Sequence, residues 1–243
     1  MVAHAPPVGD VMLQSAFVAV WGESAPVVVH PETGKAANDL TVTALALEPL
    51  GRNRFALITR EVAHTGGHAA AGAVSVGYLE RRSRGWRRVG NWREIAWAGE
   101  SGGGNLTIAV RRDLGATPLL LVNGSHLGQG YLDGTAVIVR LARDGPKVLG
   151  RIPTFARYDG SPSDVLETFS YRSRIVPTAR RALFEVRYAG WEEPSAGAPR
   201  RPFRARARFS IRDGCLAIET PVALPGERPS PEPEDCPAKD APT

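Results

Sequence analysis

Lysine is scarce in this sequence. Of its 30 basic residues only Lys35, Lys147 and Lys239 are lysines, so arginine carries nearly all of the positive charge. The formal net charge is +5 at pH 7. A basic surface attracts nucleic acid, anionic polysaccharide or acidic protein. A general preference of the source genome for arginine codons is the alternative, in which case the composition implies no anionic partner.

Long apolar runs are lacking as well. No segment approaches the roughly 20 apolar residues of a membrane-spanning helix, so no transmembrane segment is predicted. The N-terminus has no basic region followed by an apolar stretch, and no secretory signal peptide is predicted either. Ala3-His4-Ala5 has the small-residue pattern of a cleavage site. That pattern favours a mature, exported chain.

Cysteine is rare, with one residue at Cys215 and one at Cys236. A bridge between them would close a loop of about 22 residues and add about 3 kcal/mol of stability. Such a bridge persists only in an oxidising compartment. The pair therefore favours a periplasmic or secreted protein, and two unrelated thiols in a cytoplasmic protein are the alternative.

Glycine and proline are abundant, with 26 and 20 residues spread along the chain. This distribution of glycine and proline is typical of many short strands joined by turns. We predict a single β-rich domain over residues 1–220 and an acidic, proline-rich tail over 221–243. The tail carries five acidic and two basic side chains: Glu227, Glu232, Glu234, Asp235 and Asp240 against Arg228 and Lys239.

One helix is predicted, over residues 10–22, because Asp10 suits its start, Gly22 suits its end, and apolar residues recur at helical spacing. The rest of the chain predicts strands. They cover residues 27–30, 40–47, 55–60, 73–80, 86–92, 106–111, 119–122, 130–141, 147–152, 164–171, 183–188, 203–211 and 215–219, with 172–181 as a connection.

The fold class that follows is mostly β, built of antiparallel hairpins in a meander, and arranged as a sandwich or in a propeller-like way. Gly85, Gly145 and Asp213-Gly214 mark hairpin turns. The first two hairpins lie about 60 residues apart, which indicates an internal repeat of units near 54–112 and 113–155.

Two arginine-rich stretches are the candidate binding residues. Residues 203–212 alternate, so that Phe203, Ala205, Ala207, Phe209 and Ile211 share one face of a strand. The opposite face carries Arg204, Arg206, Arg208 and Arg212. A hairpin tip holds the second group, which comprises Arg81, Arg82, Arg84, Trp86, Arg87 and Arg88. Guanidinium groups suit phosphate, sulfate and carboxylate; a solvated face that guards an edge strand is the alternative.

Catalytic signals are weaker. Ser101 fits a G-x-S-x-G pattern, but a strand is predicted after it where a nucleophile elbow needs a helix. His64 and His68 are four residues apart, but Gly66 and Gly67 argue against the helix that would make this a metal-ligand pair. His126 occupies the matching place in the second predicted unit. No cofactor and no metal site is predicted.

The tryptophans at 86, 92 and 97 favour core packing, with an exposed sugar-binding platform as the alternative. Trp86 and Trp92 are an even number of residues apart, which places both on one side of a regular strand.

The function these features favour is a non-enzymatic envelope or periplasmic module, of a binding or inhibitor type, that engages an acidic or anionic partner through its arginine-rich strands. One alternative is a hydrolase that uses the region of His64, His68, Ser101 and His126. The other is a basic nucleic-acid-binding protein, although no nucleic-acid-binding fold signature accompanies the arginines.

Overall fold

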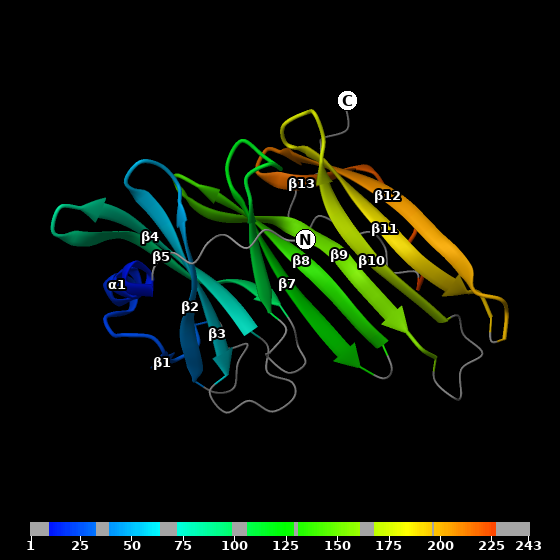
Figure 1. The fold of residues 1–243 in the computed structure, drawn as a ribbon, viewed down its shortest axis with the longest axis horizontal. Coiled ribbons are helices and arrows are strands. Elements are labelled where there is room, and N and C mark those ends of the chain that lie inside the picture. Colours follow the sequence, from blue (N-terminus) through cyan, green and yellow to red (C-terminus); the bar gives the residue numbers. More distant parts are fainter. Residues whose placement is uncertain are drawn as a thin grey trace, which may run out of the picture. The chain divides into compact units, whose positions relative to one another are not determined.

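The computed structural model confirms a mostly β protein of antiparallel strands with a short N-terminal helix (Figure 1). Strands make up 69% of the described residues. They form a five-stranded sheet and an eight-stranded sheet, and in each sheet the strands follow one another in sequence order. No helix of the described chain is long and apolar enough to cross a membrane. The residues that the structure describes are 10–32, 39–63, 72–98, 106–128, 131–160, 168–195 and 197–226.

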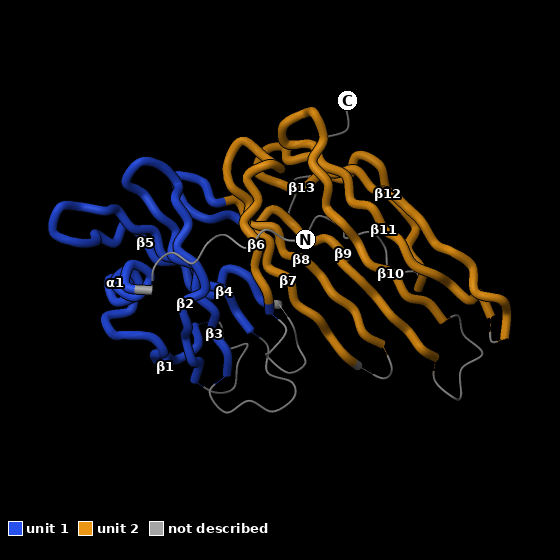
Figure 2. The backbone as a smooth tube through the Cα atoms, in the orientation of Figure 1, with its two compact units in different colours: residues 1–106, 141–147 blue, residues 107–140, 148–243 orange. Residues whose placement is uncertain are grey.

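The chain forms two compact units (Figure 2). Unit 1 comprises residues 1–106 and 141–147, and unit 2 comprises residues 107–140 and 148–243. The predicted single domain over residues 1–220 stays a prediction.

Unit 1 holds the helix and the five-stranded sheet. Its elements are α1 (Asp10–Trp21), β1 (Val27–Val29), β2 (Leu40–Pro49), β3 (Arg54–Ala63), β4 (Gly72–Arg82) and β5 (Gly85–Ala98). The helix ends as predicted, since the Gly22 N–H donates to the Val18 carbonyl at 2.8 Å. It buries Phe17 and Val20 against the sheet. A Cβ on Gly77 of β4 would lie 2.7 Å from Val20 Cγ2, so glycine permits this close approach.

The β4–β5 hairpin is irregular, with two register shifts, one between Val74 and Val76 and the other between Tyr78 and Leu79. Trp86 packs edge-on against Phe55 at 5.2 Å, and Phe55 is paired with Leu79. Trp92 packs against Tyr78 at 4.9 Å. Because Tyr78 and Leu79 are adjacent on β4, their side chains point to opposite faces. The two tryptophans therefore lie on opposite faces, and the expectation that they share a side is wrong because the bulge inverts the alternation.

Unit 2 is built on the eight-stranded sheet. Its strands are β6 (Thr107–Arg111), β7 (Leu119–Gly128), β8 (Tyr131–Ala142), β9 (Gly145–Tyr158), β10 (Thr168–Pro177), β11 (Leu183–Glu193), β12 (Arg201–Arg212) and β13 (Cys215–Thr220), the β8–β9 turn being part of unit 1. Aromatic side chains fill its core. Phe184 and Phe209, directly opposite on β11 and β12, stack at 5.7 Å.

Several strands extend beyond their predicted ends, among them β5 to Ala98, β7 to Gly128 and β9 to Tyr158. Two further differences change the assignment of a segment. The first part of the stretch 172–181, expected as a connection, continues β10 as far as Pro177, because it stays paired with β11 and Ile175 still packs on the core. Residues 221–226, assigned to the tail, pack on the core of unit 2, where Leu224 is buried. The remainder of the predicted tail lies outside the described residues.

The predicted hairpin turns are confirmed. Gly85 and Gly145 have φ of 124° and 145°, values that favour glycine. Asp213 and Gly214 form the turn between β12 and β13. The hairpin β4–β5 belongs to the five-stranded sheet and β8–β9 to the eight-stranded sheet. Their origin as an internal repeat stays a prediction.

Candidate functional site

One face of the sheet in unit 2 carries six arginines on three neighbouring strands, and we call it the arginine face. The pattern of exposure alternates along each strand, so that Tyr171, Val186 and Ala207 are buried while the arginines between such residues are exposed. The arginine face consists of Arg172 and Arg174 on β10, Arg187 on β11, and Arg204, Arg206 and Arg208 on β12.

The strand register places these arginines side by side. Arg174 is directly opposite Arg187, which is directly opposite Arg206. In the next row Arg172 and Arg204 flank Ala189. Neighbouring strands are about 4.8 Å apart, so the like charges of a row are close neighbours. Such a row raises the free energy of the folded chain unless a negative charge lies near it.

Glu185 is the acidic residue within this surface. Its Oε1 accepts a hydrogen bond from Arg187 Nε at 2.5 Å, and its Oε2 lies 4.0 Å from Arg208 Nε. The Arg187 hydrogen bond lowers the pKa of Glu185, with further lowering by Arg206 and Arg208. In the described part of the chain, Arg172, Arg174 and Arg204 form no ion pair. The arginine face therefore keeps a large excess of positive charge.

The sequence found half of this surface. Arg204, Arg206 and Arg208 lie on one exposed face, with Phe209 buried on the other. Arg212 instead pairs with Glu219 of β13 at 2.5 Å. Arg172, Arg174 and Arg187 were missed, although the alternation of residues 171–175, Tyr-Arg-Ser-Arg-Ile, was a usable signal.

The second predicted group, at the tip of the β4–β5 hairpin, has a different environment. The Trp86 Nε1–H donates to Ser15 Oγ at 2.9 Å, and the Arg81 guanidinium lies 5.4 Å from the Trp86 ring. The Arg88 Nη1–H donates to the Val20 carbonyl at 3.1 Å. These contacts attach the hairpin to α1. Trp86 is thus part of the packing of unit 1, as the core interpretation predicts.

Of the remaining arginines of the tip, two pair with a glutamate and one is exposed to solvent. Arg87 and Arg82 lie 2.5 and 3.5 Å from Glu80 Oε2. Arg84 occupies the exposed turn. Most of this predicted site therefore already has partners within unit 1.

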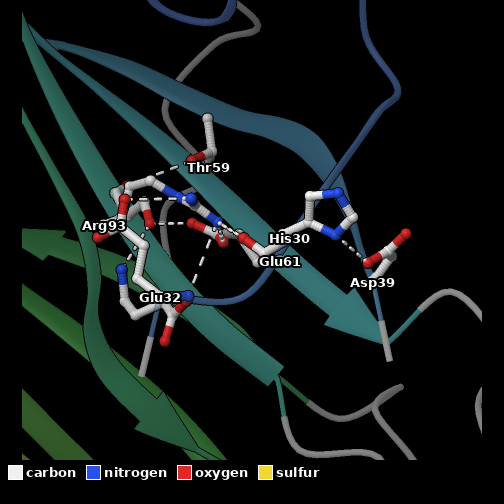
Figure 3. A network of polar contacts seen from close by, with 8 residues as sticks. His30, Glu32, Asp39, Thr59, Glu61 and Arg93 are labelled. Carbon is white, nitrogen blue, oxygen red and sulfur yellow. Dashed lines mark hydrogen bonds and ion pairs between the residues drawn. The ribbon is translucent and has the colours of Figure 1, made fainter. Parts of the chain in front are cut away.

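Unit 1 also contains a buried polar network that the sequence did not reveal (Figure 3). It lies on the same face of the sheet as α1, where Glu61, Ser75 and Arg93 from β3, β4 and β5 come together. Arg93 Nη2 lies 3.1 Å from Glu61 Oε2 and donates to the His30 carbonyl at 2.9 Å. The Arg93 guanidinium also covers the Trp21 ring at 5.5 Å. One arginine thus connects β3 and β5 with the segment that precedes β2.

Two carboxylates in this network are completely buried, those of Glu61 and Glu94. Ser75 donates a hydrogen bond to Glu61 and accepts one from the Glu94 N–H at 2.7 Å. Glu94 Oε1 accepts a hydrogen bond from the Glu32 N–H at 2.5 Å and lies 3.9 Å from Arg93 Nη2. Two buried carboxylates therefore share one guanidinium.

The environment of Glu61 favours its neutral form. Burial raises its pKa, hydrogen bonds from Ser75 and Arg93 together with the charge of Arg93 lower it, and the charge of Glu94 raises it further. The net result is a pKa above the ordinary 4.5. Titratable groups of this kind concentrate at functional sites but also occur in structural networks. No group of three or more metal-ligand side chains is present among the described residues. The contacts of this network are those of a structural element that joins β3, β4 and β5.

Most residues of the hydrolase hypothesis fall in parts of the chain that the structure does not describe. His64, His68 and Ser101 lie outside the described residues. His126, on β7, is opposite Asp133 on β8, with His126 Nδ1 3.9 Å from Asp133 Oδ1. This pair is a cross-strand contact on a partly exposed surface. The hydrolase hypothesis stays untested.

The predicted disulfide bond is untested as well. Cys215 begins β13 and is partly buried. Cys236 lies outside the described residues, so the predicted bridge stays a prediction. No disulfide bond is formed within the part of the chain that the structure describes.

The fold and its charges define a class of protein, an antiparallel β protein with two charged regions. In unit 1 a covered sheet face holds a buried network of charged side chains, and in unit 2 an exposed sheet face carries arginines. No protein-family model matches the chain, and neither does any curated protein or solved structure. Its function has therefore to be argued from the arrangement of its own residues.

Proposed function

We propose that this chain is a non-enzymatic binding protein that holds an acidic protein partner on its arginine face. The observation that carries the proposal is the row formed by Arg174, Arg187 and Arg206, which are directly opposite one another on three strands. Like charges at such positions destabilise a sheet. A partner that presents carboxylates would offset this repulsion on binding.

Arginine suits this role better than lysine. Its planar guanidinium donates two parallel hydrogen bonds to a carboxylate, which gives geometric specificity in addition to charge. The face is also anchored on a rigid base, because the alternate residues of the same strands are packed in the core of unit 2. A preorganised surface loses little conformational entropy when a partner binds.

The test reverses two charges of the row and leaves Arg187 in place. In Arg174→Glu/Arg206→Glu, the new carboxylates lie directly opposite Arg187, so the free energy of unfolding should equal or exceed that of the wild type. Affinity for a labelled oligoglutamate, measured by fluorescence anisotropy, should fall by about tenfold or more. Loss of binding without loss of stability separates a binding role from a structural one.

The matched control is Arg84→Glu/Arg181→Glu, which makes the same change of net charge at two exposed turn positions. It should retain affinity within about twofold, because long-range attraction is screened at physiological salt. An unchanged affinity in the Arg174→Glu/Arg206→Glu variant would defeat the proposal. Tighter binding of duplex DNA than of oligoglutamate, with a steep dependence on salt, would replace the acidic partner by nucleic acid.

An envelope or periplasmic location is part of the same proposal. It is supported by the pair Cys215 and Cys236, whose bridge requires an oxidising compartment. The intact mass of the protein from its native cell, measured without reductant, tests it: a loss of two hydrogens supports the bridge, and a fully reduced chain favours the cytoplasm.

A further inference from the structure

A second basic site lies in unit 1, on strands that take no part in the arginine face. It is a pocket of about 680 Å³. Three chain segments form it: the β2–β3 turn, the end of β4, and the β8–β9 turn, all of which belong to unit 1. The residues that line it are Leu50, Gly51, Arg52, Asn53, Arg54, Glu80, Arg81, Arg82 and Arg143.

The walls of this pocket are held in place by short-range contacts. The Leu50 N–H donates to the Arg54 carbonyl at 2.7 Å, and the Arg81 N–H donates to the Asn53 carbonyl at 2.8 Å. On the other side, a Cβ on Gly145 would lie 3.0 Å from Trp92 Cζ2, so the β8–β9 turn packs directly on the ring of Trp92. The pocket is therefore built on the sheet and on two tight turns.

The balance of charge in the pocket is strongly positive. Glu80 is its acidic side chain, and the hydrogen bond from Arg87 lowers the pKa of Glu80, which keeps it ionised. Arg82 lies 3.5 Å from the same carboxylate. The Arg81 guanidinium is directed to Met12 and Trp86. Glu80 is thus paired with Arg82 and Arg87, whereas Arg81 packs against a thioether and an aromatic ring.

Besides Arg81, the guanidinium groups of Arg52, Arg54 and Arg143 also have no acidic partner in the described part of the chain. Arg54 is positioned by the Tyr78 ring, 5.4 Å away, and its Nε–H is buried without an acceptor. The pocket thus brings together positive charges that repel one another. A bound anion would relieve this repulsion and stabilise the folded chain by mass action.

We infer that this pocket binds a small phosphate-bearing ligand with at least two negative charges, such as a compound that carries a diphosphate group. Guanidinium groups match phosphate oxygens in both charge and geometry. The pocket volume falls within the range of about 300–1,000 Å³ that is typical of small-molecule sites, which is larger than a single phosphate requires. This site does not depend on the arginine face, because the two surfaces share no residue.

The test is isothermal titration calorimetry of the full chain with inorganic pyrophosphate as the probe. Arg52→Glu and Arg143→Glu should each weaken binding by about tenfold or more, since each removes a charge-assisted hydrogen bond and adds a repulsive charge. Both positions are on exposed turns, so these variants should unfold at nearly the wild-type temperature. At equal concentration, pyrophosphate should also raise the unfolding temperature of the wild type by more than that of Arg143→Glu.

Two control variants distinguish binding in the pocket from attraction by the net charge of the protein. Arg84→Glu changes the same charge on the neighbouring hairpin turn outside the pocket, and it should retain affinity within about twofold. Arg206→Glu, on the arginine face, should also leave pyrophosphate binding unchanged, which keeps this result independent of the proposed function.

Three results would overturn the inference. One is the absence of pyrophosphate binding at millimolar concentration. Another is an equal loss of affinity in Arg84→Glu and Arg143→Glu, which would mean that the net charge attracts the anion and the pocket does not. Binding of sulfate as tight as that of pyrophosphate would defeat the assignment to a phosphate ligand.

Discussion

The two units use arginine in opposite ways. In unit 1, Arg93 lies in a network with Glu61, is only 15% exposed and covers an aromatic ring. In unit 2, Arg187 and Arg208 stand on an open strand face and are 53% and 61% exposed. The residue type is the same and the strands are alike in their alternation. What differs is whether another element of the chain covers the face.

That difference sets the energetic role of each arginine. A covered arginine has lost its hydration and must be compensated by acids, carbonyls and rings. An exposed arginine keeps its hydration, and its neighbours affect it only weakly through water. The first kind should therefore govern stability and the second should govern binding. Three predictions test this contrast, from the largest effect to the smallest.

The largest effect is expected from removal of the covered arginine, Arg93. Arg93→Met leaves the carboxylates of Glu61 and Glu94 without their guanidinium and should reduce the free energy of unfolding by about 3–5 kcal/mol. Arg187→Met, on the open face, should change it by less than about 1 kcal/mol. Urea denaturation of the two variants measures both values. Equal losses would mean that coverage does not determine the role of these arginines.

An intermediate effect is expected from the titration of Glu61. Its folded-state pKa is raised, so the folded chain holds this proton more tightly than the unfolded chain. Its contribution to stability is fully present below pH 4.5 and is lost as the pH rises through the folded-state pKa. The stability of the wild type relative to Glu61→Gln should therefore fall with rising pH, by at most about 1.4 kcal/mol per pH unit.

Glu80→Gln provides a control of opposite sign for that experiment. The hydrogen bond from Arg87 lowers the pKa of Glu80, so the contribution of Glu80 is lost as the pH falls below 4.5. Urea midpoints measured from acidic to neutral pH should show the two slopes with opposite signs. A flat difference between wild type and Glu61→Gln would show that the carboxyl of Glu61 keeps its ordinary pKa.

The smallest effects compare one arginine from each predicted binding stretch. Arg81→Gln loses the cation–π contact with Trp86 and should cost about 0.5–1 kcal/mol. Arg204→Gln removes an exposed charge from the arginine face and should change stability by less than about 0.5 kcal/mol. Thermal unfolding measures both values. A larger loss for Arg204→Gln would mean that the arginine face has a structural role.

Much of the fold was predictable because its signals are local. Period-two alternation located the strands, and turn residues such as Gly85 and Gly145 located the hairpins. The helix was predictable from its apolar spacing and from Gly22. Long-range pairing was harder, since β10 extends beyond its predicted end and its arginines join those of β12 only through the register with β11.

The candidate site divides in the same way. The alternation within residues 203–212 shows from the sequence alone that arginine occupies one face and apolar residues the other. The environment of the 81–88 stretch depends instead on α1, which contributes Met12 and Ser15 from about 70 residues away along the chain. The local sequence pattern does not distinguish an arginine that packs against a helix from one that is exposed to solvent.

The sequence by itself therefore determined the class of fold, the hairpin turns, the approximate positions of the strands, and the side of β12 on which its arginines lie, because each depends on residues a few positions apart. Only the tertiary structure decided that Arg93 is largely covered and lies beside two buried glutamates, and that Arg52, Arg54 and Arg143 line one pocket. These groupings bring together residues from separate strands and turns. They depend on strand register, on the β-bulges of β5 and on the packing of α1. The free energy of such contacts comes from surface that is buried only when separate segments pack together.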